Sequence, residues 1–90
     1  MSVRFKIRVS GRVQGVGYRY FALTLARSLE VDGWVRNERD GSVSCEAQGG
    51  AATLERFVEG LRRGPEYSKV ENVDAQAIDV TADDTGFVIC

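Results

Sequence analysis

The sequence predicts an α+β fold, an α/β sandwich in which two helices lie on one face of an antiparallel sheet. Apolar residues along the 90-residue chain repeat with the period of a strand or of a helix, in the order β-α-β-β-α-β with a short last strand. No linker or internal repeat interrupts this order. Two helices cannot cover both faces of such a sheet, so both are expected on the same face. We therefore expect one domain over residues 1–90.

The first half of the chain holds the patterns of strand, helix and strand. A first strand is predicted at residues 3–9, where apolar residues alternate with basic ones. A helix is predicted from about Tyr18, because apolar residues with helical spacing then form one stripe, with Phe21 beside it: Tyr18, Ala22, Leu25, Ala26 and Leu29. Strand character returns at residues 31–37.

The second half repeats the pattern. The turn signal Asp40-Gly41 leads into a strand at about residues 42–48, and a second helix follows with the apolar stripe Leu54, Phe57, Val58 and Leu61. Gly64-Pro65 ends this helix, because proline cannot continue it. Strands near residues 70–80 and at residues 87–89 complete the chain. This order is the split βαβ, or ferredoxin-like, arrangement, which serves many functions and identifies none by itself.

The composition excludes several kinds of chemistry. The chain has no histidine, which removes the usual general base, the Ser-His and Cys-His nucleophiles and the commonest zinc ligand. Cys45 and Cys90 have no metal-binding or redox spacing, so we expect reduced thiols, with Cys45 packed as a small hydrophobe. The net charge of −1 offers no global field for an anion, so any anion site must be local. We expect neither a metal nor a cofactor.

The hydropathy of the chain predicts a location. No apolar run approaches the roughly 18 residues that span a membrane. Arg4, Lys6 and Arg8 interrupt the first ten residues, which therefore do not resemble a signal peptide. We expect a cytoplasmic monomer without membrane contact.

The most informative stretch is residues 11–19, between the first strand and the first helix. Glycines at 11, 15 and 17 allow the backbone N–H groups from Gln14 to Arg19 to converge on tetrahedral oxygens. The helix N-terminus and the Arg19 guanidinium add positive charge, so this loop is a candidate phosphate site. The glycine pattern alone fits an ordinary strand-to-helix turn with a solvated Arg19 equally well.

Better-known phosphate loops do not match. A nucleotide P-loop ends in Gly-Lys-Ser/Thr, whereas Gly17 is followed by Tyr18 and Arg19. A dinucleotide fingerprint needs glycine at position 20, which is Tyr20. A cysteine phosphatase needs a thiol at the mouth of the loop, and none is present.

A second candidate lies at the end of the predicted strand over residues 31–37. With the first and third strands in the middle of the sheet, the end of this strand and the start of the first helix can share one edge of the molecule. The neutral amide of Asn37 could then hold a water in line with phosphorus. Spacing alone favours Asn37 as an ordinary turn residue and Trp34 as a packing residue.

Two segments together resemble the signature motifs of the acylphosphatase family: Gly11-Arg12-Val13-Gln14-Gly15-Val16-Gly17-Tyr18-Arg19 and Gly33-Trp34-Val35-Arg36-Asn37. Weaker matches are Asp40-Gly41-Ser42-Val43, Ala47-Gln48-Gly49, Gly64-Pro65 and Phe87-Val88-Ile89. The likeness covers essentially the whole chain in order and spacing. The fold it implies is the same α/β sandwich.

The resemblance also implies an activity. Acylphosphatases hydrolyse carboxyl-phosphate anhydrides, such as carbamoyl phosphate, to a carboxylate and phosphate. Arg19 takes the place of the family's phosphate-binding arginine and Asn37 that of its water-orienting asparagine. The phosphate cradle falls on the loop amides of Gln14, Gly15, Val16, Gly17 and Tyr18. The carboxylate is a good leaving group, so charge stabilisation and positioning can carry catalysis, with a phosphate oxygen accepting the proton of the water.

Two departures from the family pattern bear on local structure. Many members have glycine where the first helix ends, but this chain has Glu30, so its cap must be made differently. Many members end in a basic or aromatic residue that braces the loop, whereas this chain ends in Cys90. We expect the loop to be held by other contacts or to be held less firmly.

Two rival functions stay open. RNA-recognition domains share the fold, but the exposed face of the first strand carries Arg4, Lys6 and Arg8, and the third strand has no aromatic residue. The pI of about 5.4 also argues against a nucleic-acid binder. The other rival is an anion-binding domain without turnover, or one belonging to a larger maturation enzyme.

Overall fold

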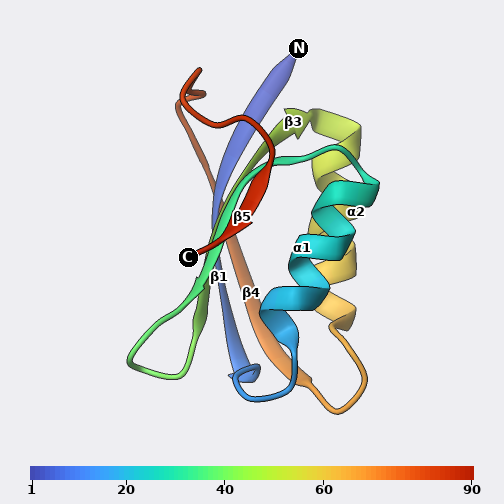
Figure 1. Ribbon diagram of the computed structural model, residues 1–90, viewed down its shortest axis with the longest axis vertical. Helices are drawn as coiled ribbons and strands as arrows, with labels where there is room; N and C mark the ends of the chain where they lie inside the picture. The colour runs from blue at the N-terminus through green and yellow to red at the C-terminus, as the bar shows by residue number, and fades with distance from the viewer.

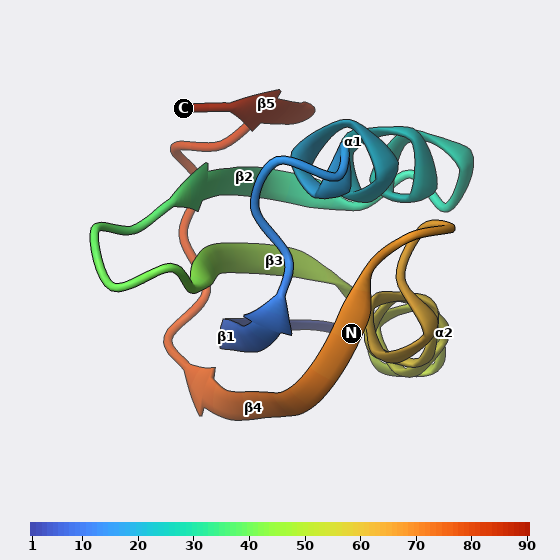
Figure 2. The same cartoon turned by 90° about the horizontal axis from the view of Figure 1, so that it is seen from below.

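The computed structural model describes residues 1–90 and contains one five-stranded sheet with two helices on one of its faces (Figures 1 and 2). The elements are β1 Ser2–Arg12, α1 Tyr18–Ser28, β2 Asp32–Asn37, β3 Val43–Gly50, α2 Ala51–Arg63, β4 Lys69–Ile78 and β5 Phe87–Ile89. All the predicted elements are present, and the ferredoxin-like α+β fold is confirmed. Neither helix is long and apolar enough to cross a lipid bilayer.

The strand order in the sheet is β4-β1-β3-β2-β5, with β1 and β3 adjacent as predicted. β1 pairs antiparallel with β3 and β4, and β2 pairs antiparallel with β3. One detail differs from the predicted antiparallel sheet, because β5 pairs in parallel with β2. Residues 79–86 carry the chain from the β4 edge to the opposite edge, where β5 starts at the same end as β2. The sheet is therefore mixed, with β5 rather than β2 on that edge.

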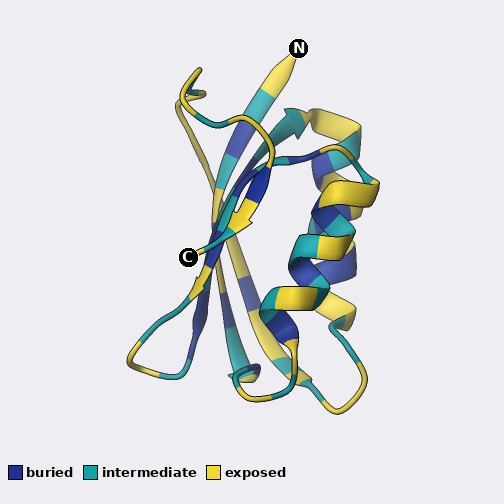
Figure 3. Ribbon diagram, in the orientation of Figure 1, coloured by how far each residue is buried: buried dark blue, intermediate teal, exposed yellow.

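The core fills the space between the sheet and the helices (Figure 3). α1 buries Tyr18, Ala22 and Ala26 of the predicted stripe, whereas its two leucines are only half-buried. α2 buries Leu54, Phe57, Gly60 and Leu61. A Cβ at Gly60 would lie 2.4 Å from a methyl carbon of Leu25, so glycine here lets the two helices approach closely.

The C-terminal end of α1 has no glycine to adopt the left-handed conformation that commonly ends a helix. Glu30 itself adopts the left-handed conformation, with φ of 57°, at a cost of about 1–2 kcal/mol. The turn is closed by Glu30 N–H donating to Arg27 O at 3.2 Å and Val31 N–H donating to Ala26 O at 2.8 Å. The expectation of a differently made cap is met by this strained residue.

The prediction was wrong for one residue on the face of the sheet opposite the helices. Arg4, predicted on an exposed basic strip, is 4% exposed beneath the connection between β4 and β5. Its guanidinium donates to Glu46 at 3.0 Å, to Gln48 at 3.2 Å and to Asp84 at 2.6 Å. Burial lowers the pKa of Arg4, but the hydrogen bonds to Asp84 and Glu46 outweigh burial and raise it. Arg4 therefore fastens residues 79–86 to the sheet.

Candidate active site

The loop between β1 and α1 lies at the same end of the molecule as the hairpin between β2 and β3 (Figure 1). Gly15 and Gly17 have φ of 75° and 78°, a conformation that glycine adopts without strain. Gly17 is the N-cap residue of α1, no side chain caps the helix, and its first turn has no acidic residue. The first N–H groups of α1 are therefore free of side-chain partners, which suits an anion.

A cavity of about 240 Å³ opens in front of this helix terminus. It brings together Arg19, from the first turn of α1, and Asn37, the last residue of β2. The remaining lining residues are Val13, Gly15, Gly17, Tyr18, Tyr20 and Ile89. Two residues predicted for the cradle do not line the cavity: Gln14, whose side chain points to the hairpin, and Val16, which packs against the core.

Arg19 makes no ion pair and no side-chain hydrogen bond within the protein. It follows Tyr18, whose buried hydroxyl donates to Leu61 O at 2.7 Å. Burial raises the pKa of Tyr18, so the phenol stays protonated and remains a donor. This bond anchors the first turn of α1, which carries Arg19, to the end of α2.

Asn37 carries an unsatisfied acceptor. Its Oδ1 is buried and has no hydrogen-bond partner, and no other buried side-chain oxygen or nitrogen in the protein lacks one. A buried polar atom without a partner costs about 1–3 kcal/mol and calls for an explanation, such as a bound water or ligand. The side chain on the cavity wall is thus an acceptor in need of a donor.

The neighbours of Asn37 are engaged elsewhere. Arg36 lies over the Trp34 ring, with 4.9 Å from its guanidinium carbon to the ring centroid, and its Nε donates to Glu38 at 2.8 Å. The hydrogen bond from Arg36 lowers the pKa of Glu38. Trp34 does not line the cavity, in keeping with its expected packing role.

Residues that the sequence analysis missed are Val13, Tyr20 and Ile89 on the cavity wall. No sequence pattern marked Tyr20 as a site residue, except that it follows Arg19. Ile89 belongs to the closing Phe87-Val88-Ile89 segment, and its register opposite Val35 places it beside the end of β2. Only the parallel pairing of β5, which residue patterns do not reveal, brings it to the site.

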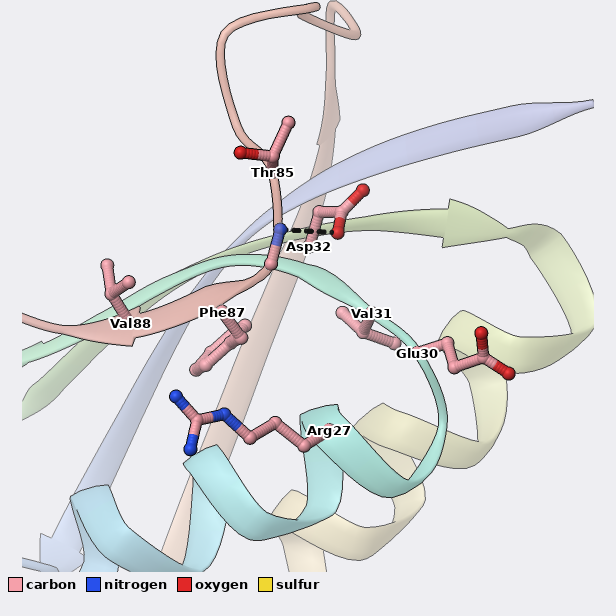
Figure 4. A pocket seen from close by; sticks show the side chains of 8 residues that line it. Arg27, Glu30, Val31, Asp32, Thr85, Phe87 and Val88 are labelled. Carbon is pink, nitrogen blue, oxygen red and sulfur yellow. Dashed lines mark hydrogen bonds between the residues drawn. The ribbon is translucent and has the colours of Figure 1, made fainter.

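A second depression lies at the other end of α1 and is lined by Arg27, Glu30, Thr85 and Phe87 among others; the Arg27 side chain lies near Phe87, whereas the Glu30 carboxylate points away (Figure 4). Its Asp32 carboxylate accepts a hydrogen bond of 2.9 Å from the Gly86 N–H, so that polar group already has a partner. No group of three or more cysteine or acidic side chains in the protein is arranged to hold a metal ion. The cavity at Arg19 and Asn37 is the better candidate.

Comparisons with known proteins agree with this fold and identify the family. The sequence model of the acylphosphatase family matches residues 5–89. The acylphosphatase of Bifidobacterium longum is 54% identical over 83 residues, which cover 89% of this chain and 86% of that protein. The crystal structure of the acylphosphatase from Bacillus subtilis superposes with a TM-score of 0.94, at 36% identity and over 98% of both chains.

A longer relative also matches. The carbamoyltransferase HypF2 of Cupriavidus necator is 46% identical over 89 residues, which cover 98% of this chain but 11% of that protein. The family match extends over nearly the whole chain, as does the likeness to relatives of similar length. This chain belongs to the acylphosphatase family.

Proposed function

We propose that the protein is an acylphosphatase, which hydrolyses small acyl phosphates to a carboxylate and inorganic phosphate. The observation that carries this proposal is the cavity lined by both Arg19 and Asn37, and it is supported by the Oδ1 of Asn37, a buried acceptor that has no donor within the protein. In the reaction, a water oxygen bonds to phosphorus while the bond from phosphorus to the acyl oxygen breaks. The electron pair of that bond leaves with the carboxylate.

Arg19 and the loop bind the phosphoryl group. The planar guanidinium can donate to two phosphate oxygens at once, and it has no competing partner in the protein. The N–H groups of the loop and the first turn of α1 add donors of fixed direction. These groups stabilise the negative charge that spreads over the phosphoryl oxygens in the transition state.

Asn37 holds the attacking water. Its Oδ1 accepts one hydrogen of the water, which leaves a lone pair of the water oxygen free to attack phosphorus. The amide is neutral, so it does not repel the anionic substrate as a carboxylate would. Positioning of this kind lowers the barrier because the water no longer has to be captured from bulk solvent.

The proton of the water goes to a phosphoryl oxygen of the substrate. Glu38, which directly follows Asn37, is the acidic residue nearest to it in the sequence. It is paired with Arg36, and its pKa is lowered, so it is a poor base. Tyr18 is a buried, protonated donor. The departing carboxylate needs no general acid, so no protein side chain has to exchange a proton.

Hydrolysis of benzoyl phosphate in the presence of a chelator tests the proposal. Arg19→Ala and Asn37→Ala should each lower kcat/KM by roughly 10²-fold, as removal of other transition-state donors does. Arg56→Ala on the exposed face of α2 is the matched control and should keep the wild-type rate. Circular dichroism verifies that each variant is folded. A folded wild-type protein without turnover would refute the enzyme, and phosphate binding without turnover would favour the anion-binding alternative.

We propose further that the protein is a cytoplasmic monomer of one domain that does not bind nucleic acid. The burial of Arg4 and the pairing of Arg8 with Asp40 support the last point, because they neutralise most of the basic strip on β1. Light scattering tests the monomer, and gel-shift measurements with single-stranded RNA test the absence of binding. Cell fractionation tests the location.

A further inference from the structure

We propose that the side chain of Gln14 is a positioning residue, which holds Asn37 in place relative to the phosphate loop. The inference rests on the proposed function and assigns Gln14 a role other than the cradle role implied by its backbone amide. It starts from two hydrogen bonds of the Gln14 side chain. Its Nε2 donates to Glu38 O at 2.7 Å and to Ser42 O at 2.8 Å.

These two bonds use the full donor capacity of the Gln14 side chain, since a primary amide has two N–H bonds. Gln14 is half-buried and does not line the cavity, so the side chain is not itself placed to contact substrate. No other side-chain hydrogen bond joins residues 13–17 to residues 38–42. Gln14 is thus the specific link between the loop and the hairpin.

The two carbonyl groups that accept from Gln14 lie beside Asn37, one in the chain and one across the hairpin. Glu38 follows Asn37 in the chain, and Ser42 precedes Val43, the residue that pairs with Asn37 across the hairpin. The hairpin is closed at this point by Glu38 N–H donating to Ser42 O at 2.9 Å. A displacement of this closing pair would therefore shift the backbone of Asn37 with it.

The site needs such a link because its two halves belong to different elements. Arg19 and the loop amides move with α1, whereas Asn37 moves with the end of β2. A misplacement of about 1 Å between a bound phosphoryl group and its water can cost about 10²-fold in rate. Gln14 fixes this distance through the backbone, without contact to the reacting atoms.

The chemistry of the link favours glutamine over its close analogues. Both partners are carbonyl oxygens, so the link requires two donors on one uncharged group. Glutamate would bring a carboxylate against two acceptors and place a negative charge beside the phosphate loop. Asparagine keeps both donors but shortens the side chain by one methylene group.

A double-mutant cycle with Asn37 tests the proposal. We expect Gln14→Ala to lower kcat for benzoyl phosphate by about 10-fold, while the inhibition constant of inorganic phosphate changes by less than about twofold. In the Asn37→Ala background, Gln14→Ala should cause almost no further loss, because there is no longer an amide to position. Equal losses in both backgrounds, or weaker phosphate binding with kcat unchanged, would overturn the proposal.

Gln48→Ala is the matched control. Gln48 also ties a strand to a connecting segment with two hydrogen bonds, donating to Thr81 O at 2.8 Å and accepting from Thr81 N–H at 2.9 Å. It accepts a third bond from Arg4 at 3.2 Å, so its loss is at least as disruptive, but it does not line the cavity. This variant should lose stability like Gln14→Ala and keep the wild-type kcat. A similar fall in kcat in both variants would mean that general destabilisation lowers the rate, and would refute a specific role for Gln14.

A readout independent of turnover separates this inference from the proposed function. If the wild-type protein hydrolyses no acyl phosphate, the proposed function fails, and the link is judged by NMR alone. The side-chain amide signals of Asn37 should shift in Gln14→Ala and not in Gln48→Ala. Unshifted signals in a folded Gln14→Ala would overturn the inference, and Gln14→Asn supplies the same comparison if the alanine variant does not fold.

Discussion

Substitution of Gly33 by alanine should disrupt the strand that carries Asn37. Gly33 has φ of 144° and pairs with Ala47 of β3. A Cβ at this position would lie 1.9 Å from Glu46 O and 2.8 Å from the carbonyl carbon of Glu46. Backbone atoms cannot rotate out of the way as a side chain would, so β2 and β3 would have to separate locally.

Two contributions determine how much Gly33→Ala lowers the unfolding free energy. The positive φ alone costs about 1–3 kcal/mol for a residue with a Cβ. Relief of the clash needs a backbone shift of about 1 Å in a paired strand, which adds loss of ladder hydrogen bonds at about 1 kcal/mol each. We expect a total of about 3–5 kcal/mol, a large part of the roughly 5–13 kcal/mol typical of a domain of this length.

Urea unfolding followed by far-ultraviolet circular dichroism measures the change in unfolding free energy. Gly41→Ala is the matched control, since Gly41 also has a positive φ, of 92°, but open space where a Cβ would lie. It should cost only the backbone contribution, so the two variants should differ by about 2–3 kcal/mol, or roughly 10–20 °C in Tm. Equal destabilisation by the two substitutions would refute the clash as the reason for glycine at position 33.

Three further predictions concern buried or paired groups. Arg4→Ala should lower the unfolding free energy by about 1–3 kcal/mol, because its carboxylate partners lose their counter-charge beneath residues 79–86; a change below about 0.5 kcal/mol in urea unfolding would contradict this. Hydrogen bonds from Ser42 hold the pKa of Asp40 below its usual value of about 3.9. The ionised Asp40 carboxylate therefore stabilises the folded protein at neutral pH, and this contribution is lost as the pH falls below about 4. The stability difference between wild type and Asp40→Asn should therefore shrink from pH 7 to pH 2.5, and a constant difference would argue against it. Burial raises the pKa of the Cys45 thiol, so a thiol reagent should modify only Cys90 in the folded protein, and rapid modification of both would disprove the burial.

Much of the fold could be predicted from the sequence because the relevant information is local. Alternation at residues 3–9 and the stripe of α2 reflect which face of each element packs on the core, and the structure buries most of these apolar residues fully or in part, although Arg4 on the other face of β1 is also buried. The position of the glycine-rich loop was also predictable, since three glycines within residues 11–17 interrupt the strand period before the helical period begins. The physical reading of the loop, however, left an ordinary turn equally open.

The family resemblance, more than the physical pattern, named Arg19 and Asn37. Spacing alone favoured Asn37 as a turn residue, because nothing local marks an oxygen that has no partner. An oxygen without a partner is recognisable only in the folded protein, where its burial and its possible donors are known. The pairing of the two residues in one cavity is a property of the tertiary structure.

The sequence by itself determined the order of the elements, most of the apolar faces and the place of the glycine-rich loop, because these depend on neighbours within a few residues. The tertiary structure alone decided the parallel pairing of β5, the burial of Arg4 and the direction of the Gln14 side chain. Each of these depends on partners from distant parts of the chain. A local pattern records that a side chain is polar, but whether it contacts solvent, a carboxylate or two carbonyl oxygens depends on which segments pack beside it.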